Sequence, residues 1–224
     1  EAMQRHLQQA EETLGSGLAA LDVRSTDDPP ARAVQRETER QPYDLIIMGF
    51  GQANSLELAE SMLQSGEHNL LLAPRAQDAP THALIAVTTG EPGKDDILFA
   101  GRLVRHVGAQ ATLMSVVEQA DDPAARQRAE RFLADGIRSL EILGVPAQTA
   151  VRSGVVSKAI AHELAANDYD LLVLGTPLAD REGRISLKGV VGQVMSEAIP
   201  CATLLVRSTV SSYREPVAID TVRV

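Results

Sequence analysis

Four glycines that follow an apolar run form the clearest chemical pattern in the sequence. The run "YDLLVLG" (169–175) ends at the first of them, and the loop after it leads into a predicted helix. The glycines are Gly175, Gly183, Gly189 and Gly192. A strand, a glycine-containing loop and a helix can hold a phosphate, because glycine lets the backbone approach and the first helical N–H groups bind oxygens. Arg184 and Lys188 in this loop would add positive charge to such a site.

The other reactive side chains form no catalytic pattern. Cys201, the only cysteine, opens the apolar run "CATLLVR", which is typical of a buried strand thiol. Two carboxylate pairs, at 95–96 and 121–122, lie near predicted helix starts, where capping explains them better than acid–base catalysis. The histidines lack the close spacing of a metal site: they are His6, His68, His82, His106 and His162. We therefore predict neither an enzyme nor a metal site.

Composition excludes several classes of protein. The 224 residues carry a net charge of −9 and only 3% aromatic residues, whereas nucleic-acid surfaces need clustered Lys and Arg and often stacking aromatics. No apolar run approaches the length of about 18 residues that a membrane span needs. A single cysteine allows no internal disulfide and fits a reducing compartment such as the cytoplasm.

The chain contains an internal duplication. "YDLIIMG" (43–49) matches "YDLLVLG" (169–175), and "VRS" occurs upstream of each, at 23–25 and 151–153. Each copy then ends in an apolar run, "NLLLAP" or "CATLLVRS". Such self-similarity indicates two structural units of the same kind.

The second copy reads as a complete alternation of strands and helices. Continuous apolar runs predict strands at 82–90, 111–119, 147–153, 169–175 and 201–208. Helical periodicity and capping residues predict helices at 94–108, 121–144 and 155–168. Asp122 is the expected N-cap of the long helix, with Pro123 in its first turn and Gly144 at its end. This order predicts an α/β fold with a parallel sheet covered on both faces.

The first copy contains only the later half of the same unit. It begins with a helix at about 2–15, followed by the strand runs "ALDVRS" (20–25), "YDLIIMGF" (43–50) and "NLLLAP" (69–74). The first two strands and the helix between them have no counterpart. A parallel sheet that lacks its central strands leaves backbone groups unpaired, so we expect this copy to borrow strands that lie either upstream in a longer natural chain or in another chain of an assembly.

Residues 82–208 resemble a universal stress protein domain along their whole length. The resemblance rests on the strand–helix order and on "AGRLVRHVGAQATLMSVV", "YDLLVLGT" and "GQVMSEAIPCATLLVR". It implies a Rossmann-like, flavodoxin-like three-layer fold with a five-stranded parallel sheet in the order 3-2-1-4-5. The whole chain then resembles a tandem pair, with a partial domain at 1–75, a complete domain at 82–208 and a C-terminal extension at 209–224.

The resemblance also implies how the copies associate. Family members pair through their final strands, so we expect "NLLLAP" and "CATLLVRS" to meet, within one chain or in a homo-oligomer. Tandem pairs occur free in the cytoplasm and also as the soluble tail of membrane transporters. A transporter membrane domain upstream of Glu1 is therefore one alternative, in which this part is not itself inserted in the membrane.

The family's nucleotide site is altered here. Gly175 and Gly192 match its first and last glycines, but 16 residues separate them, four more than in the family pattern. Leu178 replaces the second glycine, and Gln193 replaces the hydroxyl residue after the last. Thr88 stands where ATP-binding members have an Asp at the end of strand one. The candidate binding residues that the resemblance implies are Thr88, Val116, Gly175, Gly183, Gly189, Gly192, Gln193 and Val194.

These departures predict weak binding of ATP or AMP in the second copy, with a dissociation constant of about 0.1–1 mM for ATP. The first copy lacks the glycine framework in "GFGQANSLELAESMLQSGEHN" and should bind no nucleotide. No cofactor is fixed by the sequence itself. The function predicted is that of a non-catalytic regulatory or stress-response module. The alternatives are an ATP-binding stress protein with weak hydrolase activity and the cytoplasmic regulatory tail of a cation or amino-acid transporter.

Overall fold

The computed structural model describes residues 26–49, 55–73, 79–197 and 199–207. The helix expected at about 2–15, the strand run at 20–25 and the C-terminal extension at 209–224 lie outside the described residues.

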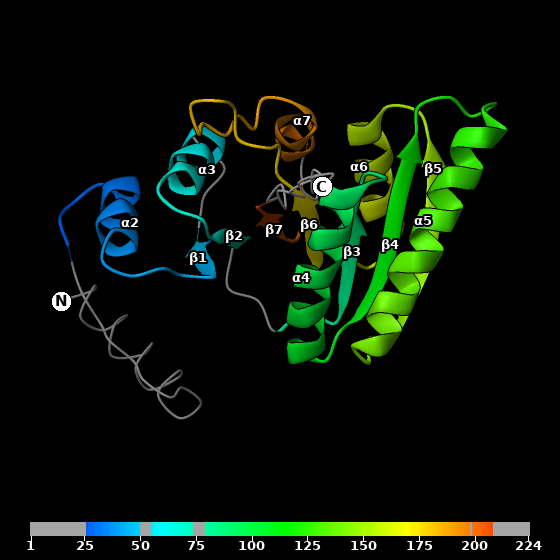
Figure 1. Ribbon diagram of the computed structural model, residues 1–224, viewed down its shortest axis with the longest axis horizontal. Helices are drawn as coiled ribbons and strands as arrows, with labels where there is room; N and C mark the ends of the chain where they lie inside the picture. Colours follow the sequence, from blue (N-terminus) through cyan, green and yellow to red (C-terminus); the bar gives the residue numbers. More distant parts are fainter. Residues whose placement is uncertain (1–25, 50–54, 74–78, 198, 208–224) are drawn as a thin grey trace, which may run out of the picture.

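Seven strands form one sheet in the order β1-β2-β7-β6-β3-β4-β5 (Figure 1). The strands are β1 Leu45–Gly49, β2 Asn69–Ala73, β3 His82–Ala86, β4 Gln110–Val117, β5 Ala147–Ser153, β6 Leu171–Gly175 and β7 Ala202–Val206. The last five are mutually parallel, and in their own numbering they have the predicted order 3-2-1-4-5. The α/β fold class is therefore confirmed. The sheet is larger than the five strands expected, because two strands of the first copy extend it.

The extension is made by an antiparallel contact between the final strands of the two copies. Leu70 of β2 lies opposite Leu205 of β7, and Leu72 lies opposite Thr203. This is the pair of runs that we expected to meet, and here they meet within one chain. Beyond β7, the Arg207 N–H donates to the Asn69 side chain over 2.9 Å, which ties the ends of β7 and β2 together.

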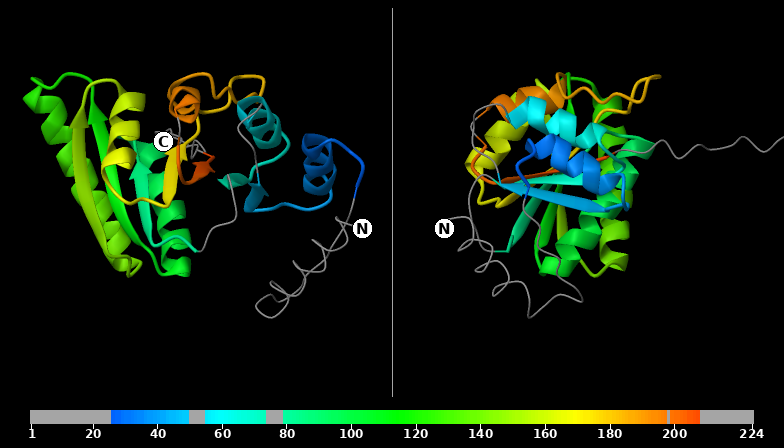
Figure 2. Two further views of the ribbon diagram at one scale, coloured as in Figure 1. Left: turned by 180° about the vertical axis from the view of Figure 1, so that it is seen from behind. Right: turned by 90° about the vertical axis from the view of Figure 1, so that its left-hand side faces the viewer.

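Helices cover both faces of the sheet (Figures 1 and 2). The helices are α2 Pro30–Thr38, α3 Ser55–Gln64, α4 Glu91–Val107, α5 Pro123–Ile142, α6 Val156–Ala166 and α7 Val190–Ser196. Helices α4 and α5 bury Ile97, Val104 and Leu133 against one face. Helices α3, α6 and α7 pack on the other. No described helix is long and apolar enough to cross a membrane.

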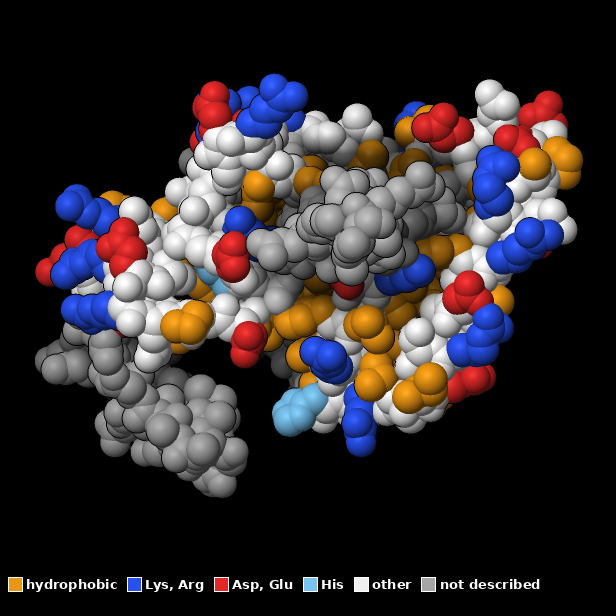
Figure 3. Space-filling view, viewed as in Figure 1, with side chains coloured by type: hydrophobic (Ala, Val, Ile, Leu, Met, Phe, Trp, Pro, Cys, Tyr) orange, Lys and Arg blue, Asp and Glu red, His pale blue; other side chains and the backbone are white. Residues whose placement is uncertain are grey.

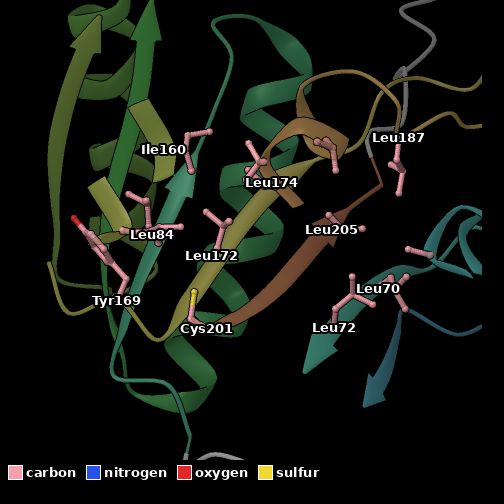
Figure 4. Close-up of a cluster of buried hydrophobic side chains, with 14 of the residues drawn as sticks. Leu70, Leu72, Leu84, Ile160, Tyr169, Leu172, Leu174, Leu187, Cys201 and Leu205 are labelled. Carbon is pink, nitrogen blue, oxygen red and sulfur yellow. The ribbon is translucent and has the colours of Figure 1, made fainter. Parts of the chain in front are cut away.

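The second face has one hydrophobic core that spans both copies (Figure 4). Leu70 and Leu72 of β2 join Leu172 and Leu205 of the second copy in this cluster, and all four are 0% exposed. The sheet and this core thus run through both copies. The division into units at 1–75 and 82–208 stays a prediction.

The capping residues in the sequence predicted the two ends of the long helix α5 correctly. The Asp122 carboxylate accepts a hydrogen bond from the Ala125 N–H over 2.8 Å, as an N-cap should. Gly144, just beyond the helix, has φ +74°, a left-handed conformation that ends helices and that glycine adopts most easily. Cys201 is also placed as predicted: it is buried in the core, and burial raises the pKa of its thiol to about 11.

Candidate ligand pocket at the ends of β3, β4 and β6

A cavity of about 830 Å³ lies at the carboxyl ends of β3, β4 and β6. The chain runs from β3 outwards to β4 and β5 and then returns to β6 on the other side of β3. Such a reversal of strand order leaves a crevice at the strand ends, which is where open α/β sheets bind ligands. The volume lies within the range of small-molecule sites.

Three of the predicted binding residues line this pocket. They are Thr88 after β3, Val116 in β4 and Gly175 at the end of β6. The parallel register brings the ends of these strands together from distant parts of the sequence. Apolar walls come from Met114, Ile160, Leu174 and Val191.

The other five predicted residues do not line the pocket. Gly192 and Val194 are buried residues of α7, and Val194 is 0% exposed in the core. Gln193 is exposed on the same helix. Gly183 lies in a turn with φ +78°. Gly189 is the N-cap of α7, although Val190 and Val191, directly after it, do contact the cavity.

Contacts within the chain account for two of the glycines. A Cβ atom at position 175 would clash with the carboxylate of Asp96, which packs directly over Gly175. A Cβ atom at position 192 would clash with the backbone carbonyl of Leu187. The space that glycine opens at both positions is therefore filled by the chain itself, and these glycines are needed whether or not a phosphate binds.

Asp96 is the pocket residue that the sequence analysis missed. We expected the 95–96 pair to cap a helix start, but α4 begins at Glu91, with Gly90 as its N-cap. That expectation is wrong for Asp96, which lies in the second turn and is only 3% exposed. The helix starts earlier than its apolar periodicity suggested. A carboxylate one turn inside a helix, on the same side as Ile97 and Ala100, was the available signal.

The charged side chains of the pocket are mostly acidic. Asp96, Glu118 and Asp122 line it, with Arg128 of α5 as the one lining cation among the described residues. Glu118 and Arg128 are exposed and Asp122 is partly buried, so solvent weakens their effect on a polyphosphate. The buried Asp96 is the carboxylate whose position matters most. On the face seen in Figure 3, positive and negative side chains are interspersed.

The basic residues predicted to assist a phosphate are placed elsewhere. Arg184 forms ion pairs with Asp180 over 3.1 Å and with Glu182 over 2.9 Å. Hydrogen bonds from Arg184, first from its backbone N–H, hold the pKa of Asp180 below its ordinary value. Neither Arg184 nor Lys188 lines the cavity. The positive charge of Arg184 is thus paired with carboxylates of the same loop, between β6 and α7.

A second polar cluster lies between α6 and the strands β3, β5 and β6. Glu163 of α6 is buried, accepts a hydrogen bond from Tyr169 over 3.1 Å and pairs with Arg152 over 2.7 Å. The rings of Tyr169 and His82 are in contact, with 4.4 Å between their centroids. Burial raises the pKa of the Tyr169 hydroxyl. None of these residues lines the pocket, and the cluster joins α6 to β5, β6 and β3.

The solved structures that resemble this chain include universal stress proteins. A putative universal stress protein from Pseudomonas aeruginosa matches with a TM-score of 0.66 at 15% identity, over 92% of this chain and 78% of its own. A protein of unknown function from the same species gives 0.64 at 15% identity, over 93% and 78%. A universal stress protein from Archaeoglobus fulgidus gives 0.56 at 17% identity, over 92% and 78%.

No protein-family model matches the sequence, and no curated protein sequence matches it either. At these identities the likeness concerns the fold. The chain therefore has the fold of the universal stress proteins.

Proposed function

We propose that the chain is a non-catalytic regulatory module of the universal stress protein type, whose pocket binds adenine nucleotides only weakly. The observation that carries the proposal is the carboxylate of Asp96, which packs over Gly175 at the position of the first phosphate-loop glycine. It fills the close approach that a phosphate would use and adds negative charge there.

The pocket fits a nucleoside better than it fits a triphosphate. Its volume and its apolar walls, including Met114 and Ile160, suit a base and a sugar. The part of the site that would hold phosphates fits less well. The Leu187 carbonyl fills the space at Gly192, and Arg184 is paired with Asp180 within the loop. Helix α7 has only seven residues, so its N-terminus adds little positive potential.

The lining also supports a role in binding rather than in catalysis. Among the described residues that line the cavity there is no histidine, cysteine or lysine. One of its carboxylates, Asp122, is engaged as a helix cap. A general base or nucleophile would have to come from the remaining carboxylates and hydroxyls of the lining. We propose a cytoplasmic location, either free or as a transporter tail.

Titration calorimetry with ATP and magnesium tests the proposal. We expect a dissociation constant of about 0.1–1 mM for the unmodified chain. Asp96→Asn keeps the shape and removes the carboxylate beside the expected phosphate position, so ATP should bind at least about tenfold more tightly, because like charges repel more strongly at a buried position than at the surface.

Gln193→Ser is the matched control, because Gln193 is exposed and does not line the pocket. It should leave the affinity unchanged, although the family pattern has a hydroxyl residue there. A micromolar constant for the unmodified chain, or steady release of phosphate from bound ATP, would contradict the proposal. Parallel titrations with AMP and cyclic dinucleotides would show which nucleotide is preferred.

A further inference from the structure

The imidazole of His68 is buried without a hydrogen-bond partner. His68 directly precedes β2 and is 1% exposed, and neither its Nδ1 nor its Nε2 atom has a hydrogen-bond partner among the described residues. Burying a polar group without a partner is costly, and such groups are rare in folded proteins. The ring is therefore expected to bind a polar group that these residues do not supply.

His68 lines a second cavity, of about 320 Å³, which we call the His68 cavity. Its walls come from the end of α2 and the segment that leads to β1, and from the turn between α3 and β2. Thr38, Tyr43 and Gly66 are among its lining residues, and none of its described residues also lines the pocket at the ends of β3, β4 and β6. The volume is at the lower end for small-molecule sites, which suits a ligand smaller than a nucleotide.

The matching place in the second copy is filled by apolar packing (Figure 4). Strand register pairs His68 with Cys201, because each residue directly precedes the final strand of its copy. Tyr43 corresponds in the same way to Tyr169. Cys201 and Tyr169 are buried in the hydrophobic cluster of the second copy, together with Leu164. The first copy has an imidazole in place of the thiol, and its tyrosine is only partly buried.

The surroundings of the ring favour an uncharged ligand. Burial and the positive charge of Arg207 lower the pKa of His68, so the imidazole is neutral near pH 7 and offers no positive charge to an anion. The guanidinium of Arg207 already donates to the carbonyls of Leu63 and Gly66. A cation would be repelled by the same guanidinium. No group of three or more His, Cys, Asp or Glu side chains in the described ranges could hold a metal ion.

A hydroxyl group can pair with this ring in either tautomer. Neutral imidazole has one N–H donor and one acceptor nitrogen, whereas a hydroxyl group both donates and accepts. The hydroxyl of Tyr43, in the same lining, accepts a hydrogen bond from the Gln41 side chain over 2.6 Å. Its own proton can be donated to a second oxygen of the ligand.

We propose that the His68 cavity is a binding site for a small uncharged polyol. One hydroxyl group of the ligand pairs with the imidazole of His68, and another accepts a hydrogen bond from Tyr43. A free polyol such as glycerol and a monosaccharide such as glucose share this chemistry, and the test includes both. The site belongs to the first copy and goes beyond the nucleotide pocket of the proposed function.

Nuclear magnetic resonance of the isotope-labelled full chain, with glycerol and glucose as probes, tests the proposal. We expect saturable shifts of the His68 ring nitrogens and of the Gly66 and Glu67 amides, with a dissociation constant of about 1–20 mM for a ligand of so few atoms. The amides of Thr88 and Gly175, in the other pocket, should not shift. Acetate and ethylammonium at the same concentrations should produce no saturable shift, because both are charged.

Three variants locate the ligand. His68→Leu should weaken binding at least about tenfold, measured at the Gly66 and Glu67 amides, because the hydrogen bond to the imidazole is lost. Tyr43→Phe should weaken it about threefold, since one neutral hydrogen bond is removed. Cys201→Ala, at the matching position of the second copy, should leave it unchanged. Circular dichroism should show all three variants folded, since none introduces a charge or a larger polar group into the core.

Three results would overturn the proposal. Saturable shifts that His68→Leu leaves unchanged would place the ligand elsewhere. A response to acetate or ethylammonium as strong as that to glycerol and glucose would show that the site is not selective for uncharged ligands. No saturable shift at His68 with either polyol would mean that the ring takes water alone. ATP binding is measured separately at the other pocket, so none of these results decides the proposed function.

Discussion

Strands β6 and β1 show how differently one sequence pattern can be used in two parts of the same sheet. β6 is flanked by β3 and β7 and covered by helices on both faces, so Leu171, Leu172 and Val173 are each no more than 1% exposed. Within the described residues β1 has a strand on one side only, and Ile47 in its middle is 65% exposed. The comparison teaches that an apolar run in the sequence indicates that a strand can be buried. Its neighbours decide whether burial is achieved.

The largest effect should come from placing a charge at the corresponding positions of the two strands. Val173→Asp puts a carboxylate into the core without a partner and should lower the free energy of unfolding by more than about 4 kcal/mol, or prevent folding. Ile47→Asp should change it by no more than about 0.5 kcal/mol, because the side chain is already exposed. Urea denaturation measures both. A large loss from Ile47→Asp would show that β1 is covered after all.

A smaller effect should separate the glycines that end the two strands. Gly175→Ala places a methyl group against the buried carboxylate of Asp96 and should cost about 1–3 kcal/mol of stability. Gly49→Ala meets no atom within 4 Å and should be close to neutral. Thermal or urea unfolding of the two variants gives the difference. If Asp96→Ala did not restore part of the stability of Gly175→Ala, the clash would not be its cause.

The smallest effect concerns the residues that precede the two final strands, His68 and Cys201. Burial, together with the nearby positive charge of Arg207, lowers the pKa of His68, so the folded chain holds it neutral while the unfolded chain binds a proton. Stability should therefore fall as the pH drops below about 6.5, by at most about 0.8 kcal/mol at pH 6. The Cys201 thiol adds nothing in this range, because its pKa is raised to about 11.

Unfolding free energies measured between pH 8 and pH 6 test this difference. His68→Leu should flatten the pH dependence, and Cys201→Ala should keep the slope of the unmodified chain. Equal slopes for all three proteins would mean that His68 does not respond to pH as its burial suggests.

The sequence predicted the second copy well because its signals are local. The run "AQTAVRS" became β5 with the bounds expected, and Asp122 and Gly144 act at the two ends of α5 as predicted. Caps and turns depend on a few adjacent residues, so they can be recognised without knowledge of the rest of the chain. The start of α4 was predicted three residues late, because the residues at 91–93 do not belong to its apolar stripe.

The pocket could be predicted only in part. The strand ends supplied Thr88, Val116 and Gly175, since parallel strands bring their carboxyl ends to one edge. The glycine pattern suggested a phosphate loop, but it does not say what fills the space that each glycine opens. Whether Gly175 admits a ligand or a side chain depends on α4, which lies far away in the sequence.

The sequence by itself determined the order of strands and helices, the duplication and the apolar character of both strand faces. These properties can be inferred from periodicity and from short motifs, because both depend on a few neighbouring residues. Tertiary structure alone decided that β2 meets β7 antiparallel within one chain and that the Asp96 carboxylate lies over Gly175. The physical reason is that burial and pairing are properties of neighbours, and neighbours are chosen by the packing of the whole sheet.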